Sequence, residues 1–181
     1  SIKGHLEKIR ALKIDLIAPS HGPVHKNPDL ILNAYTEWIS DDVKNEVVIP
    51  YVSMHGSTQK MVEHFTNALI ARGVTVKPFN LTRTDLGELA LALVDAATVV
   101  IATPTVLFGP HPQVVSATYL ANALKPKMRF ASVIGSYGWG GKAAETIVKM
   151  LDHVKVEVIE PVIIKGLPDE AAVVAINRLA D

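Results

Sequence analysis

The fold is best indicated by residues 47–59, which read Val47-Val48-Ile49-Pro50-Tyr51-Val52-Ser53-Met54-His55-Gly56-Ser57-Thr58-Gln59. The first six are almost all apolar, which is typical of a strand buried on both faces. A short polar loop with one glycine follows, and the pattern from Ser57 onward predicts a helix to residue 72. A buried strand that leads through a short loop into a helix is the first half of a β-α-β unit.

The same alternation continues from this stretch to the end of the chain. It predicts five strands and five helices, and therefore an α/β domain with a doubly wound parallel sheet over residues 46–181. After the strand at 47–52, further strands are predicted at 74–79, 97–102, 129–134 and 154–159. The helices are predicted at 57–72, 85–93, 112–124, 140–151 and 169–179.

Residues 1–45 have a different rhythm and are predicted to form a short α/β appendage with a linker. Apolar spacing predicts a helix at 2–12, the run Ile14–Ala18 predicts a strand, and Pro19–Pro23 is dense in residues that break regular structure. A second helix is expected over 27–39, with Asn27 as its N-cap and a proline at its first position. Position 1 is Ser rather than Met, as expected of a processed or truncated chain.

The composition excludes several classes of function. Lys plus Arg number 18 and Asp plus Glu number 18, and this zero net charge argues against binding to nucleic acid or to a membrane through a basic surface. The chain has no cysteine, which excludes disulfides, thiolate metal sites and a cysteine nucleophile. No apolar run reaches the ~18 residues of a membrane span, and no signal peptide is visible, so a cytoplasmic location is expected.

Ligands of doubly wound sheets bind at the carboxyl ends of the strands, which directs attention to the loops there. The loop Ser53–Gln59 combines hydroxyl groups, a glycine and a helix start, but contains no Lys or Arg. Backbone N–H groups and the helix dipole can hold a phosphate there without a cation. It is neither a Walker A loop nor a G-x-G-x-x-G loop. The alternative is a plain capped helix start.

Two further loops follow the third and fourth predicted strands. They read Thr103-Pro104-Thr105-Val106-Leu107-Phe108-Gly109-Pro110 and Gly135-Ser136-Tyr137-Gly138-Trp139-Gly140-Gly141. Glycines let the backbone approach a flat ligand, and Tyr137 and Trp139 offer faces for stacking, although ordinary core packing is the alternative for Trp139. A response-regulator receiver is excluded, because Tyr51–Ser53 and Ala102–Thr103 stand where its carboxylates would be needed.

Together these loops resemble the FMN site of flavodoxins. More specifically, Met54-His55-Gly56-Ser57-Thr58, Pro104-Thr105 and the glycine-rich loop 135–141 resemble the C-terminal half of flavodiiron proteins (A-type flavoproteins). In that family a metallo-β-lactamase-like diiron domain precedes a flavodoxin-like domain. The resemblance implies a flavodoxin-like five-stranded sheet of order 2-1-3-4-5, with FMN as cofactor.

The resemblance also implies which residues bind FMN. The first loop would hold the phosphate, and the second and third would flank the two sides of the flavin ring. Leu107 and Phe108 replace asparagines of many relatives and leave an apolar wall. The implied site is Ser53, Met54, His55, Gly56, Ser57, Thr58, Thr103, Pro104, Thr105, Val106, Leu107, Phe108, Gly109, Ser136, Tyr137, Gly138, Trp139 and Gly140.

Residues 1–45 resemble the last segment of the diiron domain. The run Ala18–Pro23, followed by Tyr35 and Trp38, matches its exit into the linker, and His21 matches the last diiron ligand of the family. The other ligands have no counterpart in this sequence, and non-haem iron needs several N and O ligands. We therefore expect His21 to bind no metal, and this chain to carry no diiron centre.

The expected function is that of an FMN-binding electron-transfer module. It resembles the flavodoxin part of a flavodiiron O₂ or NO reductase, and we expect oxidoreductase activity only as part of such an assembly. The expected redox partner is a rubredoxin-like electron donor or a diiron-domain acceptor. A homo-oligomer is also expected. Residues 1–45 would pack either on their own flavodoxin-like domain or across the interface of that homo-oligomer. A free-standing carrier, a non-redox subunit with a decayed flavin site, and, less favoured, an FMN-dependent quinone reductase remain alternatives.

Overall fold

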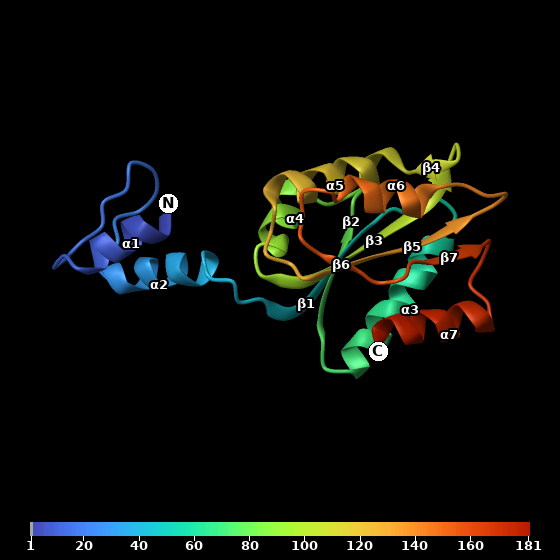
Figure 1. The fold of residues 1–181 in the computed structure, drawn as a ribbon, viewed down its shortest axis with the longest axis horizontal. Coiled ribbons are helices and arrows are strands. Elements are labelled where there is room, and N and C mark those ends of the chain that lie inside the picture. Colours follow the sequence, from blue (N-terminus) through green and yellow to red (C-terminus); the bar gives the residue numbers. More distant parts are fainter. Residues whose placement is uncertain (1) are drawn as a thin grey trace. The chain divides into compact units, whose positions relative to one another are not determined.

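The computed structural model describes residues 2–181, so the position-1 serine lies outside it. The chain divides into two compact units, one ending at Asp42 and the other running from Val43 to Asp181. The larger unit is the α/β domain and contains every loop singled out above (Figure 1).

The larger unit is built on one sheet. Its parallel core has the order β2 (Thr75–Asn80), β1 (Lys44–Tyr51), β3 (Ala96–Val106) and β5 (Phe130–Tyr137). On the outer side of β5 lie two short parallel strands, β6 (Glu157–Val158) and β7 (Val162–Lys165). A two-residue strand, β4 (Gly109–Pro110), folds back antiparallel on the end of β3. The order 2-1-3-4-5 expected for five consecutive strands is confirmed.

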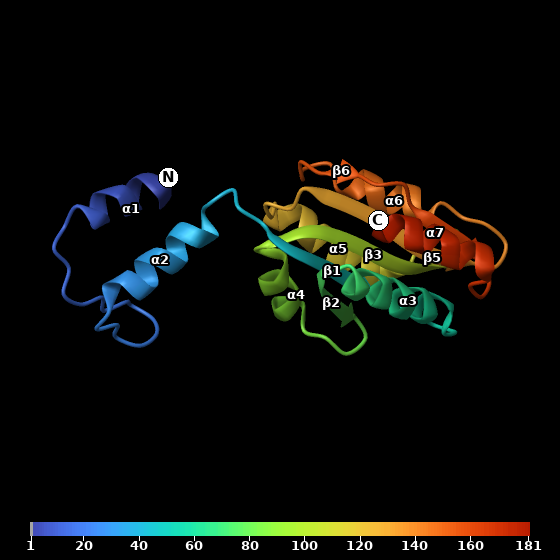
Figure 2. The ribbon, with the colours of Figure 1, turned by 90° about the horizontal axis from the view of Figure 1, so that it is seen from below.

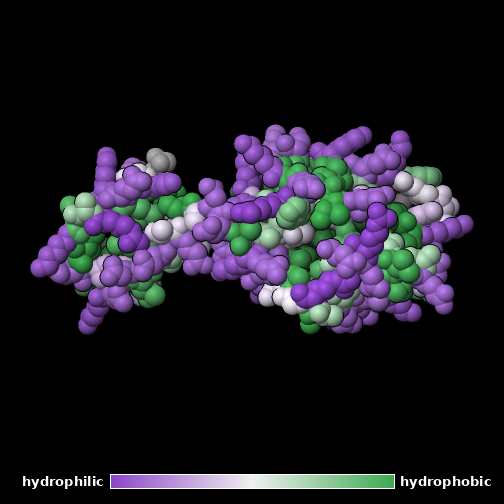
Figure 3. Space-filling model, turned by 60° about the horizontal axis from the view of Figure 1, so that its bottom comes forward, coloured by the Kyte–Doolittle hydropathy of each residue, from purple (hydrophilic) through white to green (hydrophobic). Residues whose placement is uncertain are grey.

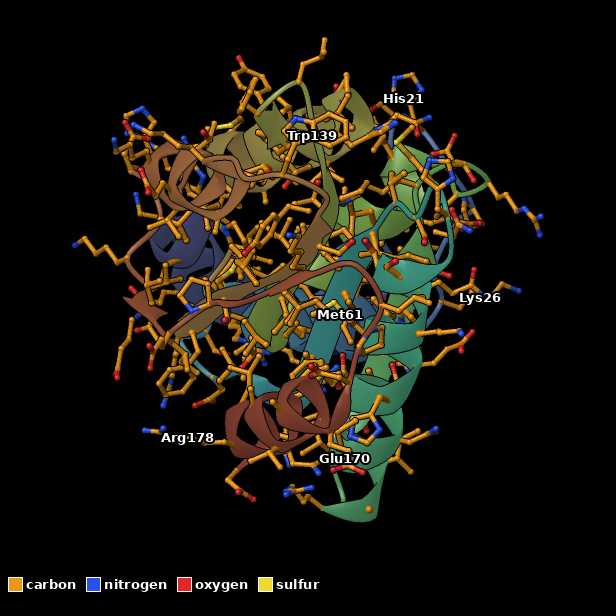
Figure 4. The ribbon with its side chains drawn as sticks, turned by 90° about the vertical axis from the view of Figure 1, so that its right-hand side faces the viewer. His21, Lys26, Met61, Trp139, Glu170 and Arg178 are labelled. Carbon is orange, nitrogen blue, oxygen red and sulfur yellow. The ribbon has the colours of Figure 1, made fainter. Side chains whose placement is uncertain are left out.

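Helices cover both faces of this sheet (Figures 1 and 2). Helices α3 (Ser57–Ala71) and α7 (Glu170–Ala180) pack on one face, and α4 (Leu86–Leu93), α5 (Pro112–Leu124) and α6 (Ala143–Met150) pack on the other. Adjacent strand residues therefore serve different cores, because side chains alternate along a strand: Val48 joins the core under α4–α6 and Ile49 the core under α3 and α7. Met61 of α3 is fully buried against this second core (Figure 4).

The fifth predicted strand is placed wrongly. Of the predicted span 154–159, only Glu157 and Val158 pair with β5, and pairing resumes at Val162–Lys165, beyond the prediction. The irregular residues between β6 and β7 include Pro161, which has no N–H for a ladder bond. The helix predicted from residue 140 begins at Ala143, because Gly140 and Gly141 adopt φ angles of +113° and +157° that no helix allows.

The smaller unit is a pair of helices with a loop between them. Helix α1 (Ile2–Arg10) contacts α2 (Pro28–Trp38), and Arg10 Nη2 donates hydrogen bonds to Asn33 Oδ1 at 2.8 Å and Thr36 Oγ1 at 2.9 Å. The strand predicted at 14–18 is wrong: only a single bridge between Ile17 and His25 forms. Asn27 precedes α2 as predicted, but its side chain makes no capping hydrogen bond.

The surface of both units is mixed in polarity. On the face shown in Figure 3, hydrophobic residues lie in patches among hydrophilic ones. Among residues 2–181, no helix has the length and hydropathy needed to cross a lipid bilayer.

Candidate functional site

A cavity of about 440 Å³ lies at the carboxyl ends of β1, β3 and β5, where the three singled-out loops meet. Each of these loops contributes five residues to its wall. The lining consists of Ser53, Met54, His55, Ser57, Thr58, Pro104, Thr105, Val106, Leu107, Phe108, Ser136, Tyr137, Gly138, Trp139, Gly140 and Gly166. No Asp, Glu, Lys or Arg is among them, so the described wall carries no permanent side-chain charge.

The first loop presents the open N-terminus of α3 to the cavity. Gly56 is the N-cap residue with φ +86°, and no side chain caps the helix from this position. The first intrahelical bond joins Lys60 N–H to the Gly56 carbonyl at 3.0 Å, so the N–H groups of Ser57 and Thr58 have no intrahelical acceptor. Ser53 Oγ accepts from the Gln59 N–H at 3.1 Å. A helix start of this kind favours a bound anion.

A buried hydrogen bond joins the first loop to the third. Thr58 Oγ1 and Ser136 Oγ lie 3.2 Å apart, and both residues are buried although they also line the cavity. The two hydroxyls are separated by 78 positions in sequence. This bond fixes the helix start against the end of β5, so the loops form one wall.

The second loop is a tight hairpin between β3 and β4. Leu107 and Phe108 are its two turn residues, with φ angles of +46° and +68°, and Val106 pairs with Gly109. Two consecutive residues at positive φ define a type I′ turn, a geometry that normally selects Asn and Gly. Leu107 is 95% exposed at its tip and Phe108 is 62% exposed. Bulky residues in the left-handed region store strain, which concentrates at functional sites.

The third loop closes against this hairpin. Lys142 N–H donates to the Phe108 carbonyl at 2.7 Å. A Cβ at Gly141 would lie 2.5 Å from Thr105 Cγ2 and 3.0 Å from the Phe108 oxygen, so glycine is required for this approach. By contrast, a Cβ at Gly138 would meet no atom within 4 Å. Gly141 is thus required where the third loop meets the hairpin, and the sequence interpretation did not include it in the site.

Trp139 stands out from the third loop at the end of the sheet (Figure 4). It is 87% exposed and lines the cavity, so the core-packing alternative for this residue is wrong. Tyr137, two residues earlier, also lines the cavity. An exposed tryptophan beside a cavity offers a face on which a planar ligand can stack.

The cavity gathers every predicted site residue except Gly56, Thr103 and Gly109. Thr103 is fully buried: its hydroxyl accepts from the His111 N–H at 3.0 Å and donates to the Pro104 carbonyl at 2.9 Å. Gly56 and Gly109 shape the backbone of the first two loops. Thr103 therefore supports the second loop from inside.

Gly166 lines the cavity and was missed. It follows β7 with φ +72°, and its N–H donates to the Tyr137 carbonyl at 2.9 Å. The position of Gly166 after a strand could have indicated its place in the site, because loops at the carboxyl ends of parallel strands gather at one edge of the sheet. It was overlooked because the fifth strand was expected to end at residue 159.

His21 lies in the smaller unit and is exposed there. Within residues 2–181, no three His, Asp or Glu side chains gather closely enough to hold a metal ion. The expectation that His21 binds no metal stays a prediction.

The cavity suits FMN in both charge and chemistry. Free N–H groups and hydroxyls at the start of α3 are donors that a phosphate needs, and no lining carboxylate would repel it. In the same lining, Trp139, Phe108 and Leu107 provide apolar surface suited to a flavin ring. The residues present therefore fit this cofactor.

Comparisons with known proteins agree with this geometry. The flavodoxin family profile matches residues 49–175. A nitric oxide reductase of Moorella thermoacetica is 35% identical over 155 residues, which cover 85% of this chain and 39% of the relative. A coenzyme F420H₂ oxidase of Methanothermobacter marburgensis is 32% identical over 142 residues, which cover 77% of this chain and 35% of the relative.

Solved structures show the same fold. The rubredoxin oxygen:oxidoreductase of Desulfovibrio gigas superposes with a TM-score of 0.91 at 24% identity, covering 98% of this chain and 46% of that one. The flavodiiron protein of Giardia intestinalis gives 0.90 at 22% identity, over 99% of this chain and 46% of that one. The resemblance to flavodiiron proteins is thus confirmed, and this chain spans less than half the length of these relatives.

Proposed function

The chain belongs to the flavodoxin family, whose cofactor is FMN, and from this premise we propose that residues 43–181 form an FMN-binding electron-transfer module. The observation that carries the proposal is the cavity itself, which is lined both by a helix start with N–H groups that have no intrahelical acceptor and by an exposed tryptophan. FMN would supply reversible electron uptake and release.

Each part of the cavity wall has a role in this proposal. The N–H groups at the start of α3 and the hydroxyls of Ser53, Ser57 and Thr58 would bind the phosphate. Trp139 and Tyr137 would contact the ring from the third loop. The apolar side chains of the hairpin, Leu107 and Phe108, would shield the other side of the flavin ring from water.

We further propose that this module serves a flavodiiron-type assembly. Relatives named as a nitric oxide reductase and as F420H₂ oxidases support this, because their similarity extends over at least three quarters of the chain. The acceptor would be a diiron domain that reduces O₂ or NO, and the donor a rubredoxin-like protein. A cytoplasmic location, a homo-oligomer and the relation of residues 1–45 to the last segment of a diiron domain belong to the same proposal.

Titration of the purified protein with FMN tests the core of the proposal. We expect flavin fluorescence to be quenched at a one-to-one ratio, and the bound flavin to be reversibly reduced under anaerobic conditions. Trp139→Ala should weaken FMN binding about tenfold, through lost stacking and burial. Trp38→Ala, in the smaller unit, is the matched control and should leave the affinity unchanged.

The same titration separates the alternatives. A protein that takes up no FMN would overturn the redox proposal and favour an interaction subunit. Bound FMN with stoichiometric iron in this chain alone would contradict the expectation that it carries no diiron centre. Bound FMN whose reduced form transfers electrons directly to a quinone would favour the quinone reductase.

A further inference from the structure

The phosphate end of the cavity lacks a permanent positive charge. No Lys or Arg lines it in the described part of the chain, and the donors available are backbone N–H groups and hydroxyls. The surrounding elements do carry charges, but none of these residues is in the lining: Lys60 and Glu63 in α3, Lys142 before α6 and Lys165 at the end of β7. Two of the lining residues have a titratable side chain, Tyr137 and His55.

His55 is the one lining side chain that can become positively charged near neutral pH. It directly precedes Gly56, the residue that begins α3, and its side chain is exposed. No hydrogen bond or ion pair involves its ring among the interactions of residues 2–181. The ring is therefore available to a ligand in the cavity.

This availability distinguishes His55 from the other histidines of the larger unit, which all have a polar partner. His64 Nε2 lies 2.9 Å from Asn177 Oδ1, His111 Nδ1 accepts from the Gln113 N–H at 3.2 Å, and His153 Nδ1 lies 3.7 Å from Asp152 Oδ1. His55, the histidine without a polar partner, is thus the one that lies beside the proposed phosphate site. No Lys or Arg side chain lines that site.

From this we infer that His55 is a specificity-determining residue that makes the preference for FMN over riboflavin depend on pH. The inference rests on the proposed FMN site. Protonated His55 attracts the phosphate of FMN, whereas neutral His55 does not, and riboflavin has no phosphate to attract. The preference for FMN is therefore expected to be greater at acidic pH than at alkaline pH.

The size of the effect follows from Coulomb's law. A unit positive charge about 5 Å from a phosphate at a water-exposed site changes the affinity about five- to tenfold, and salt reduces the change. The phosphate of FMN also titrates near pH 6, so the pH profile of the native protein alone is not diagnostic. Comparison between variants removes that contribution, because the ligand is the same in each.

The test measures dissociation constants for FMN and for riboflavin from about pH 5.5 to about pH 8.5 at low ionic strength. Four proteins are compared: the native chain, His55→Gln, His55→Lys and His153→Gln. The ratio of riboflavin to FMN dissociation constants is expected to fall about five- to tenfold more with rising pH in the native chain than in His55→Gln. His55→Lys should keep a high ratio throughout, and His153→Gln should follow the native profile.

Two results overturn the inference, and they are distinguishable. If native protein and His55→Gln bind FMN with the same profile, the inference fails while the proposed function stands. If no variant binds FMN at any pH, the proposed function fails and the inference with it. Thermal unfolding without ligand checks that each variant is folded, and His55→Lys provides a gain in FMN affinity at alkaline pH that misfolding cannot produce.

Discussion

At the scale of single residues, two glycines of the third loop differ in the space that surrounds them. Gly141 has φ +157° and is packed against Thr105 and Phe108, whereas Gly138 has open space where a side chain would be. We expect Gly141→Ala to lower the free energy of unfolding of the FMN-free protein by about 2 kcal/mol, through overpacking and backbone strain.

Gly138→Ala is the matched control, and its effect should stay within about 0.5 kcal/mol. Denaturant unfolding of both variants measures the difference. Equal stabilities would show that the contact between the second and third loops does not constrain Gly141.

The hairpin turn gives a second prediction at this scale. Leu107 and Phe108 adopt a type I′ geometry that Asn and Gly adopt more easily. We expect the double variant Leu107→Asn, Phe108→Gly to raise the free energy of unfolding by about 1–2 kcal/mol. Leu167→Asn changes an exposed leucine outside the left-handed region, so thermal unfolding of this control should show no such gain.

These residues also mark the limit of sequence interpretation. The loop containing Trp139 was identified because its glycines and aromatics are an unusual combination at a strand end. The left-handed conformation of Leu107 and Phe108 could not be predicted, because their own preferences oppose it and the tertiary contacts around the turn decide it. The participation of Gly141 depends on contacts with a loop some 30 positions away, which no local pattern contains.

At the scale of secondary-structure elements, an ion-pair cluster joins β1 to the segments that precede β3 and β5. Lys44 Nζ lies 2.9 Å from Asp95 Oδ2, and Lys127 Nζ lies 3.1 Å from Asp95 Oδ1. Burial acts to raise the pKa of Asp95, but hydrogen bonds and charge from Lys44 and Lys127 outweigh it and hold that pKa below its ordinary value.

A lowered folded-state pKa stabilises the fold above the unfolded pKa of 3.8, and this stability is lost as the pH falls through the folded value. Lys127→Met should therefore lower the free energy of unfolding by about 1–3 kcal/mol near pH 7 and weaken its fall below pH ~4. Lys125→Met, at an exposed position nearby, is the control. The free energy of unfolding of both variants is measured from neutral to acidic pH. If it depends on pH in the same way in both, the Asp95 cluster is not the cause of the stability lost at low pH.

The elements themselves were largely predictable, because long apolar strands and amphipathic helices have clear periods. The helix over 112–124 has the predicted bounds, and Asp85 and Asp169 cap α4 and α7 with hydrogen bonds to Gly87 and Ala172 N–H groups. The sheet edge was not predictable in the same way. Strands β6 and β7 are short and partly exposed, so their pairing is decided by β5 rather than by their own pattern.

At the scale of the whole molecule, nearly all buried apolar residues belong to the larger unit. Leu6 and Leu32 are the buried apolar side chains described in the smaller unit. Two such residues supply little of the burial that an independent fold requires. We expect a chain of residues 43–181 to keep the unfolding temperature of the main transition within a few degrees and its FMN affinity within about twofold.

Hydrogen exchange provides a complementary measurement on the intact chain. Amides of α1 and α2 should exchange much faster than those of β1, β3 and β5, because their opening disrupts few buried contacts. A truncated chain that no longer folds, or equal protection in both units, would show that the smaller unit stabilises the larger one.

The exposed tip of the β3–β4 hairpin has a practical consequence. Because the chain contains no cysteine, Leu107→Cys would introduce a single thiol at the rim of the cavity. That thiol offers one defined attachment point for a gold electrode or a light-driven electron donor. The domain could then be attached covalently to the electrode or donor at the mouth of its cavity. Electron transfer between the two could be measured without a protein partner.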